Sequence, residues 1–185
     1  MPLTPTKSGF GGGLFASREI CNARIRYWAE FLTGPIFHRT VARILAEPKV
    51  IYDSLNWRDT VHGDYATCDL RVVVPSESRA RVRLTLTAHI RKLPRKCSFL
   101  LIYGERIFAL DVNPARSHSN KEARRVVRET HWTTWPCDIA QPDQRDLIHH
   151  QWFSEFLNHT NIQFFGKYER PPYMSEQLNM PYFDE

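Results

Sequence analysis

The segment from Arg79 to Arg91 alternates between apolar and polar side chains without a break. Because successive side chains of a β-strand point to opposite faces of a sheet, this pattern predicts a strand with one buried face. We expect its polar face to meet water or to offer an arginine-rich platform to a ligand. The apolar set is Ala80, Val82, Leu84, Leu86, Ala88 and Ile90, and the polar set is Arg79, Arg81, Arg83, Thr85, Thr87, His89 and Arg91.

Further segments with strand-like patterns surround this one. They are Ala66 to Val74, Cys97 to Tyr103, Arg106 to Val112, Thr130 to Trp135 and Asn161 to Phe165. Gly104 and Glu105 predict a two-residue type II′ hairpin. Its register would place Tyr103 opposite Arg106, Leu101 opposite Phe108 and Phe99 opposite Leu110.

Three other segments space their apolar residues as helices do. They are Ser17 to Thr33, Ile36 to Ala46, and a stretch that begins after Asp143 and ends near Asn158. A short helical turn is also expected between Lys121 and Arg128. The sequence therefore predicts an α+β fold with an antiparallel sheet of four to six strands, two N-terminal helices, and one C-terminal helix packed on the sheet.

The length of 185 residues, 42% of them hydrophobic, is sufficient for the core of one domain. We expect a flexible lead-in over residues 1–16, one domain over 17–165, and an acidic tail rich in Pro and Tyr over 166–185. No run of eighteen apolar residues and no signal-peptide pattern occurs, which predicts a cytoplasmic protein without a membrane partner. The cysteines have no CxxC spacing, so we expect buried thiols and no cofactor. They are Cys21, Cys68, Cys97 and Cys137.

Positive charge is concentrated in the middle of the chain. The formal net charge is +5, but residues 79–128 alone carry thirteen Lys or Arg against Glu105, Asp111 and Glu122. The rest of the chain is therefore acidic. Such an asymmetry favours an anionic partner, with RNA preferred, because each neutralised phosphate releases counterions. The alternative is a solvated basic face that the acidic remainder balances in space.

A cluster of polar residues comes after the predicted hairpin. Asp111 and Asn113 end its second strand, Arg116 and His118 come next, and His131 begins the next strand. One imidazole could remove the 2′-hydroxyl proton of RNA and a protonated one could supply the leaving oxygen, without a metal. There are two alternatives. Asp111, His118 and His131 could bind a metal ion, or these residues could have a purely structural role. We predict Asp111, His118 and His131 as catalytic residues, and as substrate-binding residues Arg81, Arg83, Arg91, Asn113, Arg116 and Trp132.

The stretch from Phe99 to Phe165 resembles small prokaryotic toxin-antitoxin-associated domains, which pair a strand-terminal Asp and Asn with downstream His and Pro. The likeness involves about a third of the chain. It differs from their pattern at Thr133, where a second histidine is expected. The residues that carry it are Asp111, Asn113, Pro114, His118, Thr130, His131 and Pro136.

These features predict two functions from different classes. The preferred prediction is a protein that binds or cleaves nucleic acid, with RNA favoured, and so a ribonuclease is one candidate. The other is a non-enzymatic interaction module, an adaptor or inhibitor of phage or mobile-element origin, that presents its basic face to an acidic protein.

Overall fold

The structure is a computed structural model of the chain, and it describes residues 36–61, 63–91, 95–114, 118–120, 125–137 and 139–174. The chain divides into two compact units, residues 1–40 and 41–185, and the sheet and its cavities belong to the second unit. The predicted lead-in, the predicted helix from Ser17 to Thr33 and residues 175–185 of the predicted tail lie outside the described residues.

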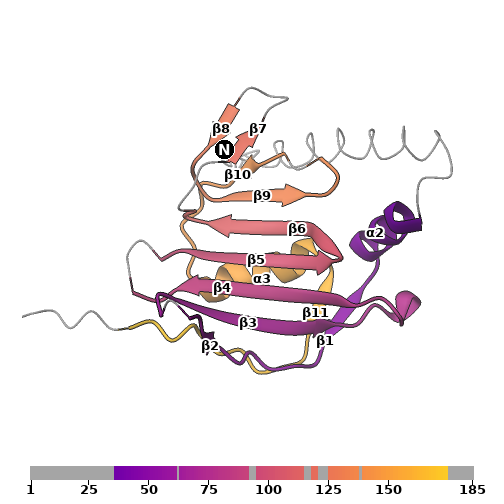
Figure 1. The fold of residues 1–185 in the computed structure, drawn as a ribbon, viewed down its shortest axis with the longest axis horizontal. Helices are drawn as coiled ribbons and strands as arrows, with labels where there is room; N and C mark the ends of the chain where they lie inside the picture. Colours follow the sequence, from indigo (N-terminus) through magenta and orange to yellow (C-terminus); the bar gives the residue numbers. More distant parts are fainter. Residues whose placement is uncertain are drawn as a thin grey trace, which may run out of the picture. The chain divides into compact units, whose positions relative to one another are not determined.

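A seven-stranded sheet forms the centre of the fold, and every neighbouring pair of its strands is antiparallel (Figure 1). The α+β class is therefore confirmed, but the sheet has more strands than the predicted four to six. Two of them have only two residues each, which is too short for an alternating pattern to reveal. In spatial order the strands are β10 (Gln141–Pro142), β9 (His131–Thr134), β6 (Glu105–Val112), β5 (Cys97–Tyr103), β4 (Val82–His89), β3 (Tyr65–Val72) and β2 (Arg58–Asp59).

The strand with the strict alternation lies near the middle of this sheet as β4. Its apolar residues are buried, and its polar residues line the other face. It is shorter than predicted at both ends, because Arg79 to Arg81 precede it, after the 3₁₀ helix η1 (Pro75–Glu77), and Ile90 and Arg91 follow it. The alternation therefore predicted the correct two faces, but not the points at which pairing begins and ends.

The predicted hairpin is β5 and β6. Leu101 does pair with Phe108, and Phe99 with Leu110, as the turn predicted. Beyond Leu101 the register shifts at a β-bulge, so Tyr103 pairs with Glu105 and not with the predicted Arg106. A bulge adds one residue to one strand only, and the apolar pattern of these strands does not reveal it.

Two α-helices lie within the described residues. Helix α2 (Ile36–Ala46) has the predicted bounds. After its last turn, the buried Lys49 Nζ donates hydrogen bonds of 2.6 Å to the carbonyls of Ile44 and Glu47, which satisfies acceptors at the helix end. Helix α3 (His149–His159) begins later than predicted, because residues 143–148 are not helical.

Helix α3 covers one face of the sheet (Figure 1). Phe156 stacks on Phe99 and on Trp132, with ring centroids 5.7 and 6.3 Å apart. Phe153 and Trp152 extend the same aromatic layer. These large side chains bury much apolar area and make this side of the sheet the core.

Two small strand pairs lie outside the main sheet. Strand β1 (Lys49–Ile51) runs parallel to β11 (Ile162–Phe164), and β7 (His118–Asn120) runs antiparallel to β8 (Arg125–Val127). The helical turn predicted between Lys121 and Arg128 is therefore wrong at residues 125–127, which form strand β8. None of the helices in the described ranges is long and apolar enough to cross a membrane.

The cysteines only partly agree with the prediction. Cys68 and Cys97 are buried free thiols, as expected. Cys137 is disulfide-bonded, so the prediction of a buried thiol is wrong there. Cys21 lies outside the described residues.

Candidate functional site

A row of polar side chains crosses the sheet on the face opposite to α3. Backbone pairing joins each member to the next, from β3 through β4, β5 and β6 to β9. Directly paired residues project to the same face, so their side chains form one continuous line. This polar row comprises Thr67, Thr87, Ser98, Asp111 and His131.

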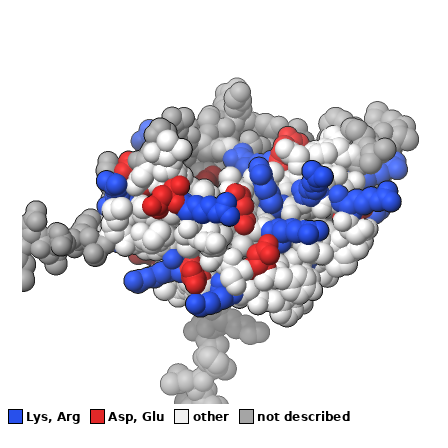
Figure 2. All heavy atoms as spheres, turned by 60° about the horizontal axis from the view of Figure 1, so that its bottom comes forward, with Lys and Arg blue, Asp and Glu red and all other residues white. Residues whose placement is uncertain are grey.

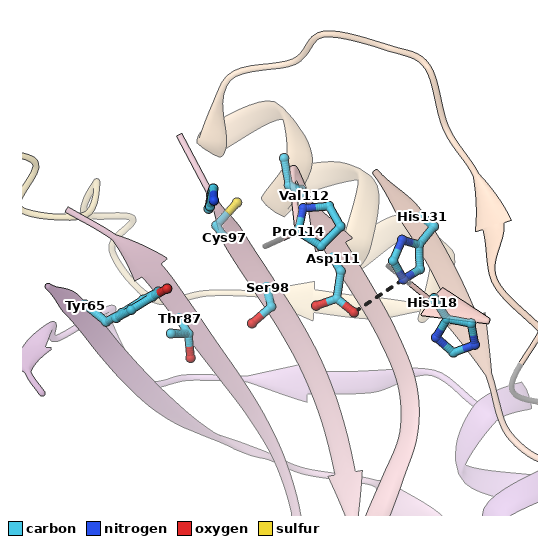
Figure 3. A pocket seen from close by; sticks show the side chains of 10 residues that line it. Tyr65, Thr87, Cys97, Ser98, Asp111, Val112, Pro114, His118 and His131 are labelled. Carbon is cyan, nitrogen blue, oxygen red and sulfur yellow. Dashed lines mark ion pairs between the residues drawn. The ribbon is translucent and has the colours of Figure 1, made fainter. Parts of the chain in front are cut away.

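A cavity of about 360 Å³ opens over most of this row. It lies at the edge of the sheet where β3, β5 and β9 begin and β4 and β6 end. In Figure 3, Thr87, Ser98 and Asp111 point to one side of their strands, with His118 and His131 next to them. Its volume is within the range of pockets that hold small ligands. The lining residues are Tyr65, Thr87, Lys96, Cys97, Ser98, Asp111, Val112, Pro114, His118 and His131.

Asp111 and His131 form an ion pair within the cavity. Asp111 Oδ2 lies 3.7 Å from His131 Nε2, and the side chains are 28% and 3% exposed respectively. His131 Nδ1 lies 2.8 Å from the carbonyl oxygen of Glu129, which can only accept a hydrogen bond, so Nδ1 carries a proton. This bond fixes the ring, and Nε2 consequently faces the carboxylate.

The environment of Asp111 changes its acidity. Burial raises the pKa of this carboxyl above its ordinary value, and the positive charges of His131, Arg106 and His118 act in the opposite direction without cancelling the effect. A carboxyl whose pKa moves toward neutrality is a better proton acceptor near pH 7 than an ordinary one. Asp111 therefore combines access to the cavity with an altered acidity.

His118 approaches the same pair from β7. Its ring centroid is 5.4 Å from that of His131, and its side chain is half-buried. The structure thus brings together the three residues that the sequence predicted as catalytic, Asp111, His118 and His131, in one cavity. Within the described residues, no group of three or more His, Cys, Asp and Glu side chains is arranged to hold a metal ion.

Several cavity residues were not predicted as site residues. Lys96 contributes a cation, and Tyr65, Thr87 and Ser98 contribute hydroxyl groups. The signal for Ser98 was present, because the predicted pairing of Phe99 with Leu110 also places Ser98 opposite Asp111. Tyr65, Thr87 and Lys96 line the cavity because β3, β4 and β5 lie side by side. The position of these strands depends on the whole sheet, so local sequence patterns do not predict it.

Trp132 takes no part in the cavity. It is the residue after His131 in β9 and so points to the opposite face, where it is buried under α3. Its ring stacks on Phe156 and His159, and its Nε1 donates a 3.0 Å hydrogen bond to Asp143. Trp132, predicted as a substrate-binding residue, therefore lies on the α3 side of the sheet and does not line the cavity.

Asn113 has a structural role next to the site. Its φ of 46° lies in the left-handed region, which Asn tolerates better than most residues. Its backbone amide donates to Thr130 Oγ1, and its side-chain amide donates to the carbonyl of Arg95. These hydrogen bonds fix the turn after β6, and Asn113 is not among the residues that line the cavity.

Three of the predicted arginines, Arg81, Arg83 and Arg91, do not line the cavity. Arg91 pairs with Asp64 at 3.3 Å and donates to the carbonyl of Gly63. Arg83 is exposed on β4, and Arg81 is exposed just before that strand. Arg116 lies outside the described residues.

Comparison with known proteins identifies no relative of the chain. No protein-family model, no curated protein and no solved structure matches it. The resemblance to toxin-antitoxin-associated domains therefore stays a prediction. The functional inference depends on the cavity and its side chains.

Proposed function

We propose that the chain binds single-stranded RNA and cleaves it at the cavity that Asp111, His118 and Lys96 line. The observation that carries the proposal is the pairing of a partly exposed carboxyl with a buried, fixed imidazole, next to a second imidazole. A proton acceptor, a proton donor and a cation in one cavity are what 2′-hydroxyl attack on a phosphodiester requires.

We assign the catalytic roles from the difference in solvent exposure between Asp111 and His131. Asp111 accepts the proton of the 2′-hydroxyl group while that oxygen attacks phosphorus. His118, in its protonated form, donates a proton to the departing 5′ oxygen, and Lys96 offsets the negative charge that develops on the phosphate. The products are a 2′,3′-cyclic phosphate and a 5′-hydroxyl end. His131 is too buried to touch substrate, so it acts through Asp111 as a positioning residue.

This assignment differs from the one expected from sequence, in which the two imidazoles were the acid and the base. The structure supports the carboxyl as the group that meets substrate, because His131 Nε2 faces Asp111 and its side chain is almost fully buried.

The test is cleavage of a ten-nucleotide single-stranded RNA by the purified chain in the presence of EDTA. Cleavage should yield 2′,3′-cyclic phosphate ends, and a 2′-O-methyl RNA or a DNA of the same sequence should remain intact because each lacks the attacking hydroxyl. Cleavage of the DNA, or intact RNA after prolonged incubation, would refute the proposed reaction.

A further inference from the structure

Three arginines lie in a second row on the face of the sheet that carries the cavity. Arg71 pairs with Arg83, Arg83 pairs with Ile102, and Ile102 pairs with Arg106. All three arginines are exposed. We call Arg71, Arg83 and Arg106 the arginine row.

The arginine row and the polar row lie a fixed distance apart. Arg83 and Thr87 are four residues apart on β4, so their side chains project from the same face. At ~3.3 Å per strand residue the separation is about 13 Å. Between the rows, Asp69 is the exposed acidic residue, and it accepts a hydrogen bond from Thr85.

The arginine row is electrostatically unbalanced. Arg71 and Arg83 stand directly opposite each other on neighbouring strands, and like charges in this position repel. Among the described residues, neither guanidinium forms an ion pair with a carboxylate. The face drawn in Figure 2 carries many basic side chains, with acidic side chains among them. A phosphate between the two guanidinium groups would relieve the repulsion and accept hydrogen bonds from both.

Arg106 links the arginine row to the cavity. Its positive charge acts on the carboxyl of Asp111, which places it within electrostatic reach of the proposed reaction centre. Its side chain also lines a second cavity of about 300 Å³, together with Glu105 and Trp135. An anionic chain that leaves the first cavity along this face would therefore continue to meet positive charge.

We propose that Arg71 and Arg83 form a second phosphate-binding subsite for the RNA strand whose reacting phosphodiester occupies the cavity. This inference rests on the proposed function. About 13 Å separates Arg83 from Thr87 along β4, and Asp111 lies two strands further across the sheet, so the subsite is at least about four nucleotides from the reacting phosphodiester at the ~3.4 Å rise of stacked nucleotides. The substrate is then an RNA strand long enough to contact both the polar row and the arginine row. A shorter RNA contacts only the cavity.

The test compares the double variant Arg71→Gln/Arg83→Gln with wild type on a dinucleotide and on a ten-nucleotide RNA. The double variant should raise KM for the longer RNA about tenfold or more, and leave kcat/KM for the dinucleotide unchanged. The dependence of log Kd on log salt should be shallower in the double variant by about 0.7, the value for one lost phosphate contact on a single strand. A double variant with wild-type KM and salt dependence on the longer RNA would overturn the subsite.

A matched control removes the same charge elsewhere. Lys167→Gln/Arg170→Gln neutralises two exposed cations on the segment whose Tyr168 packs against His149 of α3. It should behave as wild type on both substrates, and an equal rise in KM would show a general charge effect and overturn the subsite. Failure of the wild type to cleave either RNA would overturn the proposed function. If the wild type nevertheless binds the longer RNA and the double variant does not, the subsite stands without the reaction.

Discussion

Asp111 Oδ2 faces His131 Nε2 at 3.7 Å, with the carboxyl partly open to the cavity and the imidazole buried behind it. The carbonyl of Glu129 holds the far side of the same ring. A ring bonded on one side and facing a carboxylate on the other can keep that carboxylate oriented without reaching substrate itself. In the proposed reaction, the Asp111 carboxyl therefore contacts the substrate, and the His131 imidazole holds that carboxyl in position.

Replacement of His131 by Gln should change the pH dependence of cleavage. Asp111 must be deprotonated to act as a base, so the rate rises with pH through its pKa. Because the positive charge of His131 lowers that pKa, its loss should move the acidic limb of the kcat/KM profile to higher pH, by on the order of one unit. The measurement is the profile of both proteins together with Tm. An unshifted limb in a folded variant would count against the positioning role.

Buried His149 should make the fold sensitive to acid. Burial lowers the pKa of this imidazole from 6.5 to about 3, its Nδ1 lies 2.8 Å from the Tyr168 hydroxyl, and its Nε2 has no partner in the described part of the chain. The folded state therefore binds fewer protons than the unfolded state between these values. Stability should fall by about 1.4 kcal/mol per unit as pH drops below 6.5, and the loss should end near pH 3.

Chemical denaturation between pH 7 and pH 4 measures this effect. His149→Phe should flatten the slope over that range, because the titrating group is gone. His150→Gln is the matched control, since His150 is exposed on the same helix. Burial lowers the pKa of His149 more than the charge of His150 does, so the slope should stay close to wild type. A wild-type slope in His149→Phe would show that other groups cause the acid sensitivity.

Removal of the Asp143 carboxylate should destabilise the fold without affecting the cavity. Asp143 accepts hydrogen bonds from Trp132 and Arg145 on the α3 side of the sheet. Burial by itself raises the pKa of Asp143, but the hydrogen bonds from Arg145 and Trp132 outweigh it and hold the pKa below its ordinary value. The stabilisation is present above the ordinary carboxyl range and is lost as pH falls through the lowered pKa.

Asp143→Ala should therefore cost about 1–3 kcal/mol of unfolding free energy at pH 7, since it leaves the indole N–H without its acceptor. Urea denaturation measures the cost, and the rate of RNA cleavage at a temperature where both proteins are folded should be unchanged. A large loss of cleavage in folded Asp143→Ala would mean that the two faces of the sheet are coupled.

The sequence predicted most of this fold through local patterns. The alternation of β4, the apolar run of β5 and the helical spacing of α2 each depend on near neighbours, and the structure confirms them. The bulge after Leu101 and the two-residue edge strands depend on contacts between distant segments. No local period carries that information.

The sequence predicted which residues form the site, but not how their side chains are arranged in it. The spacing of Asp111, His118 and His131 placed them near one another, and they line one cavity. Alternation alone could have separated His131 from Trp132, because neighbours in a strand face opposite sides. That the side chain of Asp111 is 28% exposed and that of His131 only 3% results from burial by the whole fold, which the sequence does not display.

The most direct measurement of the central claim is kcat for cleavage of the ten-nucleotide RNA by Asp111→Asn. Asp59→Asn, the same change at an exposed position on edge strand β2, is the matched control. We predict that Asp111→Asn lowers kcat by about a hundredfold or more and keeps the wild-type Tm within a few degrees, and that Asp59→Asn stays fully active. A folded Asp111→Asn protein with wild-type kcat would contradict the claim that this carboxyl performs the chemistry.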